Sequence, residues 1–165
     1  MRIKDVALKN QRGFTLLELV IILGILAIIS VYVFSSLPNT TLSLSGQAQQ
    51  LANDIRYTQS LAMTKGQRYR WVKKSSTTYQ IQNNSGTPII LSQGNTTVTF
   101  GTGITFGTLT NLPNNLVNFD GRGTPYSDTA SPGTALSSNA TIPITAGGET
   151  HTITIAIETG GVTLQ

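Results

Sequence analysis

The chain has 165 residues, a net charge of +4 and no cysteine. This length suits one compact domain with attached segments. The missing cysteine excludes a disulfide framework, a thiolate zinc site and a cysteine nucleophile. Four basic residues and one acidic residue stand in the first thirteen positions, and the rest has seven basic and six acidic residues. The charge beyond the N-terminus is therefore close to neutral and gives no reason to expect nucleic acid as a partner.

A short basic segment, residues 1–13, precedes a long apolar run. The run covers residues 14–34 and contains Glu18 as its single charged residue. As a helix it would be about 31 Å long, which matches a hydrocarbon core of ~30 Å. Basic residues precede the run and none follows until Arg56. This distribution predicts one membrane span, residues 14–37, with the N-terminus in the cytoplasm and the later residues outside it.

A second helical pattern follows Pro38. The sequence Asn39-Thr40-Thr41 is poor helix-forming material and predicts a kink or break. Helical spacing of apolar residues beyond it predicts an amphipathic helix within residues 38–66. Its closing residues are Lys65 and Gly66, because a cation suits the last turn and glycine adopts the left-handed C-cap conformation. The apolar positions are Leu44, Ala48, Leu51, Ile55 and Ala62, and the polar positions are Gln47, Gln49, Asn53, Asp54 and Arg56.

Residues 67–165 are rich in Thr, Ser, Asn and Gly and contain short β-prone runs, which predicts a mostly antiparallel sheet. Alternation in the run 150–158 places Ile153, Ile155 and Ile157 on a buried face, against Leu51 and Ile55 of the helix. Residues 107–140 are rich in Pro, Gly and Asn, so we predict a loop with one short strand near 116–119. The other predicted strands are 68–72, 78–82, 96–100, 141–145 and 162–164, with turns at 73–76, 83–86 and 159–161.

The junction between the basic segment and the apolar run carries a motif. Gly13, Phe14 and Glu18, with the basic leader and the uninterrupted run to Phe34, resemble the class III signal sequence of type IV prepilins and pseudopilins. This resemblance implies an α+β protein with the type IV pilin fold, in which a long N-terminal helix packs on an antiparallel β-sheet head. It also implies that prepilin peptidase cuts after Gly13 and methylates the new amino terminus at Phe14.

The same resemblance implies a role and a location. The amine of Phe14 and the carboxylate of Glu18 would pair during assembly with other pilins or pseudopilins. The subunit would first lie in the bacterial inner membrane, with its head in the periplasm, and then enter a pilus or pseudopilus. An acid inside a bilayer costs roughly 2.5–3.5 kcal/mol, so Glu18 either reaches the lipid head groups or faces a partner.

Two later segments resemble one branch of the family. Residues 119–125 and 157–162, together with the helix followed directly by a strand, are similar to the pseudopilin H and FimT branch and to minor pilins of mannose-sensitive haemagglutinin type pili. DNA-binding FimT proteins carry a Gly-Arg-x-Arg element near the C-terminus, whereas this chain has Gly160-Gly161-Val162-Thr163. The resemblance therefore implies a structural subunit, either a minor pilin or a type II secretion pseudopilin, without implying DNA binding.

Two alternative functions remain open. A basic patch of Arg68, Arg70, Lys73 and Lys74 around Trp71 would suit DNA or surface binding. We favour the other interpretation, in which charged residues of a solvated strand and turn prevent sheet aggregation. The second alternative is a plain signal-anchored periplasmic domain, which would have the same apolar run. Only the motif at Gly13, Phe14 and Glu18 distinguishes a pilin-like subunit from such a domain.

Candidate catalytic and metal-binding residues are sparse. His151 is the one histidine, and no nucleophile motif or telling acid pair accompanies it. We therefore expect no enzyme and no cofactor. Calcium would need several oxygen ligands, and we expect no metal site because the acids of the head are scattered. These acids are Asp120, Asp128, Glu149 and Glu158.

Overall fold

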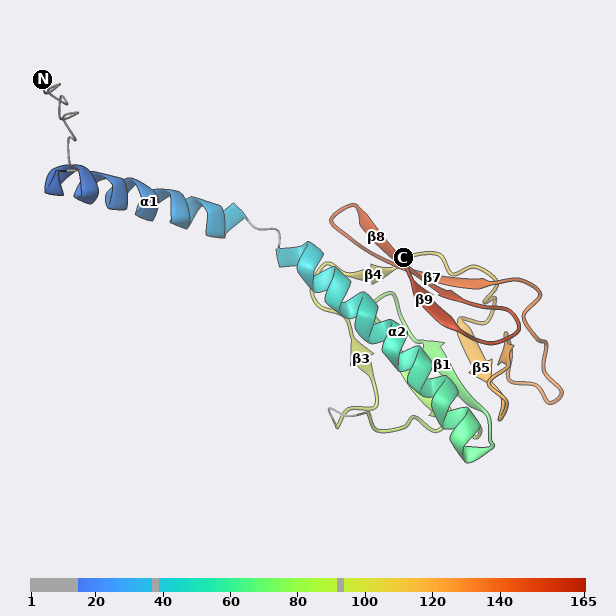
Figure 1. The fold of residues 1–165 in the computed structure, drawn as a ribbon. Helices are drawn as coiled ribbons and strands as arrows, with labels where there is room; N and C mark the ends of the chain where they lie inside the picture. The colour runs from blue at the N-terminus through green and yellow to red at the C-terminus, as the bar shows by residue number, and fades with distance from the viewer. Residues whose placement is uncertain (1–14, 37–38, 92–93) are drawn as a thin grey trace, which may run out of the picture. The chain divides into compact units, whose positions relative to one another are not determined.

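The computed structural model describes residues 15–36, 39–91 and 94–165. The chain divides into two units, one ending at residue 38 and the other beginning at residue 39. The first contains helix α1 (Leu16–Ser36), and the second contains helix α2 (Asn39–Lys65) and all the described strands (Figure 1). Gly13 and Phe14 lie outside the described residues, and so does the basic leader.

Helix α1 begins with a side-chain cap. The hydroxyl oxygen of Thr15 accepts the N–H of Glu18 at 3.2 Å, which satisfies one of the amides that a helix start leaves without an intrahelical partner. Glu18 stands in the first turn, and the described side chains from Leu16 to Ile29 are exposed. No helix in residues 15–36, 39–91 or 94–165 combines the length and apolar character needed to cross a membrane. The predicted span includes positions 14 and 37, which lie outside these ranges.

Helix α2 (Asn39–Lys65) lies within the predicted bounds of residues 38–66. The described helices end at Ser36 and begin at Asn39, and the chain divides into its two units after residue 38, so a separation near Pro38 is as predicted, whereas residues 39–41 themselves are helical. Asn is favoured at helix starts, and the weak propensity of the first turn is offset by tertiary packing of the turns that follow. The C-terminal end is as predicted: Gly66 has φ 62°, and the N–H of Gln67 reaches the carbonyl of Ala62 at 3.2 Å, which is a Schellman cap.

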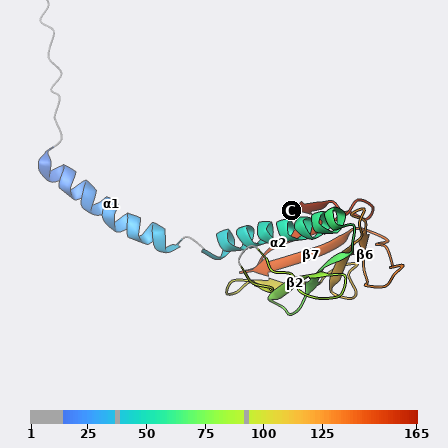
Figure 2. The same cartoon turned by 90° about the horizontal axis from the view of Figure 1, so that it is seen from below.

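The head contains two antiparallel sheets where the sequence predicts one. The five-stranded sheet has the order β3-β2-β1-β5-β6, and the four-stranded sheet has the order β4-β7-β8-β9. Figure 2 shows α2 lying along one side of the strands, and α2 contacts strands of both sheets. The strand bounds are β1 Tyr69–Lys73, β2 Thr78–Asn83, β3 Val98–Thr99, β4 Thr105–Phe106, β5 Leu116–Phe119, β6 Pro125–Tyr126, β7 Ala140–Ala146, β8 Glu149–Ile155 and β9 Val162–Leu164.

Strand boundaries differ from the prediction where pairing decides them. The expected strand 150–158 ends at Ile155, because the N–H of Gly160 turns back to the carbonyl of Ala156 at 3.0 Å. Ile157 is consequently only partly buried. The predicted short strand near 116–119 is confirmed as β5. The strands β4 and β6 have two residues each and no sequence pattern of their own.

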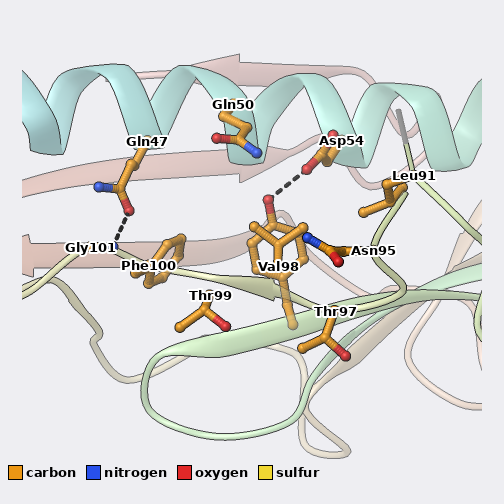
Figure 3. Close-up of a pocket in the computed structure, with 11 residues that line it drawn as sticks. Gln47, Gln50, Asp54, Leu91, Asn95, Thr97, Val98, Thr99, Phe100 and Gly101 are labelled. Carbon is orange, nitrogen blue, oxygen red and sulfur yellow. Dashed lines mark hydrogen bonds between the residues drawn. The ribbon is translucent and has the colours of Figure 1, made fainter. Parts of the chain in front are cut away.

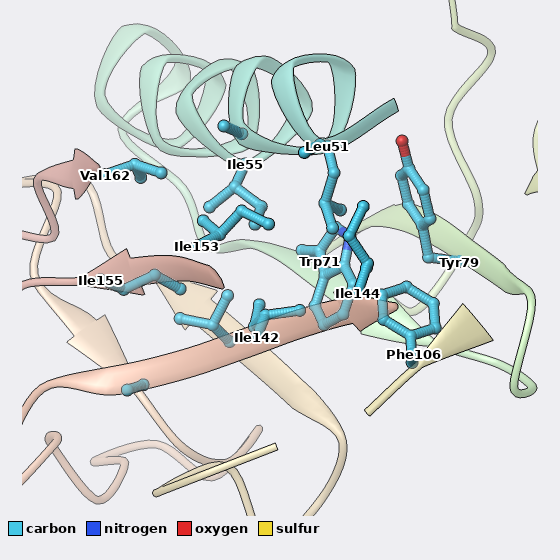
Figure 4. Packing of buried hydrophobic residues seen from close by; sticks show 14 of the residues in the cluster. Leu51, Ile55, Trp71, Tyr79, Phe106, Ile142, Ile144, Ile153, Ile155 and Val162 are labelled. Atoms are coloured by element: carbon cyan, nitrogen blue, oxygen red, sulfur yellow. The ribbon is translucent and has the colours of Figure 1, made fainter. Parts of the chain in front are cut away.

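The core of the head lies between α2 and the two sheets (Figure 4). Leu51 and Ile55 are fully buried, as are Ile153 and Ile155 of β8, which confirms the predicted contact faces. An aromatic cluster extends the core under the first turns of α2, with the rings of Phe100 and Phe106 4.6 Å apart. The apolar face of α2 is thus an integral part of the head.

We predict that residues 44–165 fold as a monomer, whereas residues 67–165 do not. The shorter fragment lacks the helix that covers both sheets. Within the longer fragment, Leu51→Ala should cost about 2–5 kcal/mol, because a buried methyl-rich side chain leaves a cavity. Chemical denaturation followed by circular dichroism measures both effects. Cooperative unfolding of residues 67–165 with unchanged stability would contradict the role of α2.

Candidate functional site

The start of α1 is the first candidate site, because it holds the predicted assembly residue. Glu18 is exposed, and its backbone N–H is capped by Thr15. A carboxylate in the first turn of a helix also interacts favourably with the helix dipole. Glu18 therefore has a local role in its own helix, independent of any partner. Its predicted partner, the amine of Phe14, lies outside the described residues.

A second candidate site lies where residues 119–125 meet residues 157–162, the two segments that resemble the pseudopilin H and FimT branch. The side-chain amide of Gln59 donates to the carbonyl of Gly123 at 2.9 Å and to the carbonyl of Thr159 at 2.7 Å. Gly160 has φ 64°, and a Cβ there would lie 2.5 Å from the carbonyl oxygen of Gly123. We call Gln59, Gly123 and Gly160 the glycine junction. It fastens two distant loops to the last turns of α2, and it requires glycine for backbone reasons.

The loop after β5 carries its own polar support. Asp120 accepts the backbone N–H groups of Arg122 and Thr124, each at 2.9 Å, and the hydroxyl of Tyr126 at 3.3 Å. Desolvation opposes ionisation of Asp120, but these hydrogen bonds and the charge of Arg122 together lower its pKa. The carboxylate thus shapes the loop that presents Gly123 to the junction.

The four predicted basic residues have different surroundings. The guanidinium of Arg68 donates to the carbonyl of Ala130 and lies 4.6 Å from the ring centre of Tyr126. Arg70 donates to Gln82 at 2.9 Å. The ammonium of Lys73 lies 5.4 Å from the ring centre of Phe106. Lys74 is exposed in the turn between β1 and β2.

A polar groove runs between α2 and the segment 95–101 (Figure 3). Its volume is about 380 Å³. The hydroxyl of Tyr79 donates to Asp54 at 2.6 Å. Burial raises the pKa of Asp54, and this hydrogen bond opposes the rise. The sequence places Asp54 on the solvent side of α2, but its carboxylate is tied to a buried tyrosine.

Asp128 and the histidine of the head form local contacts. Asp128 accepts the N–H groups of Ala130 at 3.1 Å and Thr134 at 3.0 Å. The Nε2 of His151 and the hydroxyl of Ser45 are 3.0 Å apart, which links β8 to α2. No group of three or more His, Cys, Asp or Glu that could hold a metal occurs in the described parts of the chain.

Several residues of these sites carried no prediction. The sequence does contain a signal for the cap at Thr15, because Thr15-x-x-Glu18 fits the capping-box pattern. Gln59 had none, because its partners are Gly123 and Thr159, far away in sequence. The groove is equally invisible in the sequence, because its two walls come from α2 and from a loop.

Comparison with known proteins agrees with this architecture. Residues 8–34 match the prokaryotic N-terminal methylation motif, and residues 47–161 match the family of type II transport protein GspH. Over 68 residues the chain is 40% identical to the competence protein ComGD of Bacillus subtilis (strain 168). That match covers 39% of this chain and 46% of the relative, less than half the length of either protein.

Two solved structures have the same fold. The type IV minor pilin FimU of Pseudomonas aeruginosa (strain PAO1) aligns with 74% of this chain and 87% of its own, with a TM-score of 0.52 and 17% identity. The minor pseudopilin EpsH from the type 2 secretion system of Vibrio cholerae aligns with 74% of this chain and 96% of its own, with a TM-score of 0.52 and 12% identity. At these identities the likeness establishes the fold alone.

The fold is therefore the type IV pilin fold, with a helix packed on antiparallel sheets. The chain belongs to the GspH family and carries the N-terminal methylation motif of prokaryotic pilin-like proteins. With this family match and this motif, it is a minor pilin or pseudopilin subunit.

We predict that Gly160→Ala destabilises the head by more than about 2 kcal/mol. The new Cβ would clash with the carbonyl oxygen of Gly123. The alanine would also have to adopt a left-handed backbone conformation, which costs about 1 kcal/mol. Gly148→Ala is the matched control, because Gly148 also has positive φ but has no atom within 4 Å of its Cβ position. Denaturation of both variants measures the difference. Equal losses would show that the junction contributes nothing beyond backbone strain.

Proposed function

We propose that this subunit is anchored in the inner membrane by residues 14–37, with a cytoplasmic N-terminus and a periplasmic head. Prepilin peptidase then removes residues 1–13 and methylates Phe14, and α1 carries the subunit into a type IV pilus or a type II secretion pseudopilus. We do not propose an enzymatic activity for the head.

The observation that carries this proposal is the exposed apolar surface of α1. Large hydrophobic side chains stay exposed around the described helix, among them Leu16 at 81% and Ile28 at 75%. A contiguous apolar surface of this kind marks contact with lipid or with other proteins. Because α1 forms a unit separate from the head, that surface is available to a bilayer first and to neighbouring helices later.

The polar end of α1 supports a specific role for Glu18. Thr15 already caps the helix start, so the Glu18 carboxylate is not needed to satisfy that backbone amide. The amine that cleavage would create at Phe14 is a suitable counter-charge in an apolar helical bundle. We propose that this pairing sets the register of the subunit among its neighbours.

The basic residues do not favour a second function. Arg68, Arg70 and Lys73 each contact groups within the head. These contacts support a structural use of the basic residues, so we do not propose nucleic acid as a partner.

We expect the mature chain to begin at Phe14. Its mass should be lower by the thirteen-residue leader and raised by one methyl group. Gly13→Asp should block this cut while leaving membrane insertion intact, because insertion depends on the apolar run. Mass spectrometry of the protein from its native host measures the terminus, and membrane fractionation measures insertion. A mature chain that retains Met1 or begins near residue 36 would contradict the proposed processing.

We expect Glu18→Val to be made, inserted and cut normally, but to be depleted at least tenfold from sheared pili or pseudopili. The neighbouring amine would lose its counter-charge, while the apolar run would become more favourable in lipid. The control is Thr15→Ala, which removes the cap but keeps the acid. Quantitative immunoblots at matched membrane levels measure incorporation. Equal incorporation of Glu18→Val and wild type would end the pairing proposal, and equal depletion of both variants would assign the effect to the helix start.

A further inference from the structure

The polar groove contains a carboxylate without a counter-ion. Asp54 lines it from α2, and in the described part of the chain its hydrogen-bond donor is the hydroxyl of Tyr79, 2.6 Å from Oδ2. No basic residue lines the groove. The nearest arginine along the helix, Arg56, donates instead to Asn53 and to the carbonyl of Val162. One oxygen of Asp54 is therefore left for a ligand.

Two carboxamide side chains line the same space. Gln50 and Asn95 line the groove, and neither side chain forms a hydrogen bond among the described residues. Figure 3 shows Gln50 and Asp54 on the helix and Asn95 on the opposite wall, with all three side chains directed toward the opening between them. The wall also has apolar side chains, Leu91 and Val98. The groove thus combines one carboxylate and two carboxamides, whose oxygens can accept hydrogen bonds, with an apolar edge.

This combination suits one kind of ligand. A carboxylate taken partly out of water is disfavoured unless a cation compensates its charge. The groove therefore favours a cation as its ligand and disfavours an anion. A neutral sugar would leave the charge uncompensated. A lysine side chain supplies an ammonium with three donors and an aliphatic stem that can cover apolar surface. The ammonium can donate to the carboxylate and to the oxygens of the two carboxamides, and the stem can lie on the apolar edge.

We propose that this groove binds a lysine side chain of a neighbouring subunit, with the ammonium against Asp54, Gln50 and Asn95. The inference rests on the proposed function, because assembly through α1 brings subunit heads together. The contact adds a head-to-head bond that is separate from the pairing at Glu18.

Cross-linking in assembled filaments tests the contact. A carbodiimide joins a carboxylate to a lysine amine that touches it, so wild-type filaments should yield an amide between Asp54 and a lysine of another subunit, detected by peptide mass spectrometry. Asp54→Asn should reduce that product at least tenfold. The variant keeps an oxygen for the Tyr79 hydroxyl, and its thermal unfolding verifies the fold. Glu149→Gln, which changes an exposed acid on β8 outside the groove, should leave the product unchanged.

The outcomes separate the two proposals. If the subunit is absent from filaments, the proposed function and this contact both fail. If the subunit is present but Asp54 joins no lysine, only the contact is overturned.

A second measurement does not depend on filaments. The full chain in detergent micelles is titrated with Nα-acetyl-lysine N-methylamide, while NMR follows the side-chain amides of Gln50 and Asn95. The lysine probe should shift these signals in the wild type, with at least a fivefold smaller shift in Asp54→Asn. The norleucine analogue has the same stem without the charge and should give no shift. Equal shifts with norleucine, or larger shifts with methyl glucoside, would overturn the choice of lysine.

Discussion

The burial of one face of α2 is the constraint on which the rest of the head depends. Leu51 and Ile55 are fully enclosed, and the helix contacts strands of both sheets. Within the described head, α2 is the helix that contacts the strands of both sheets, so its apolar stripe closes the core of both. At roughly 1.5–3 kcal/mol per fully buried large apolar side chain, this stripe is a large part of the stability of a small head.

The polar residues of α2 then fix the surrounding loops. Gln47 accepts the N–H of Gly101 at 2.8 Å, Asp54 holds Tyr79, and Arg56 donates to Val162 at 2.9 Å. Gln59 completes the series with its bonds at the glycine junction. A single helix thus positions β9, the loop after β5 and the wall of the groove. The groove and the junction are two consequences of the same helix, placed about three turns apart by the positions of Gln47 and Gln59.

The two units of the chain have different physical tasks. In α1 the described apolar side chains stay exposed, and the helix has one acid in its first turn. In the head, many large apolar side chains are buried in the core, and Asp54, Asp120, Asp128 and Arg56 form hydrogen bonds within the head. This division is consistent with a subunit that uses α1 for the bilayer and for assembly, and uses the head for contacts with specific neighbours. The groove at Asp54 is a candidate for one such contact.

The sequence by itself determined the features that depend on local pattern. Periodicity identified the buried face of α2, alternation identified Ile153 and Ile155, and Gly66 marked the helix end, because each of these follows from the spacing of side chains along one element. Residues 39–41 were expected to interrupt the helix but form its first turn, because packing of later turns offsets weak local propensity.

Only the tertiary structure decided which distant segments meet. The split into two sheets, the short strands β4 and β6, the bonds of Gln59 and the groove around Asp54 all depend on pairing between residues far apart in sequence. Such pairing is set by how the sheets fit against α2, and no local pattern encodes it. The sequence predicts that Asp54 is a solvent-facing acid on a helix. In the structure it is a partly buried carboxylate that faces a loop, for the same reason.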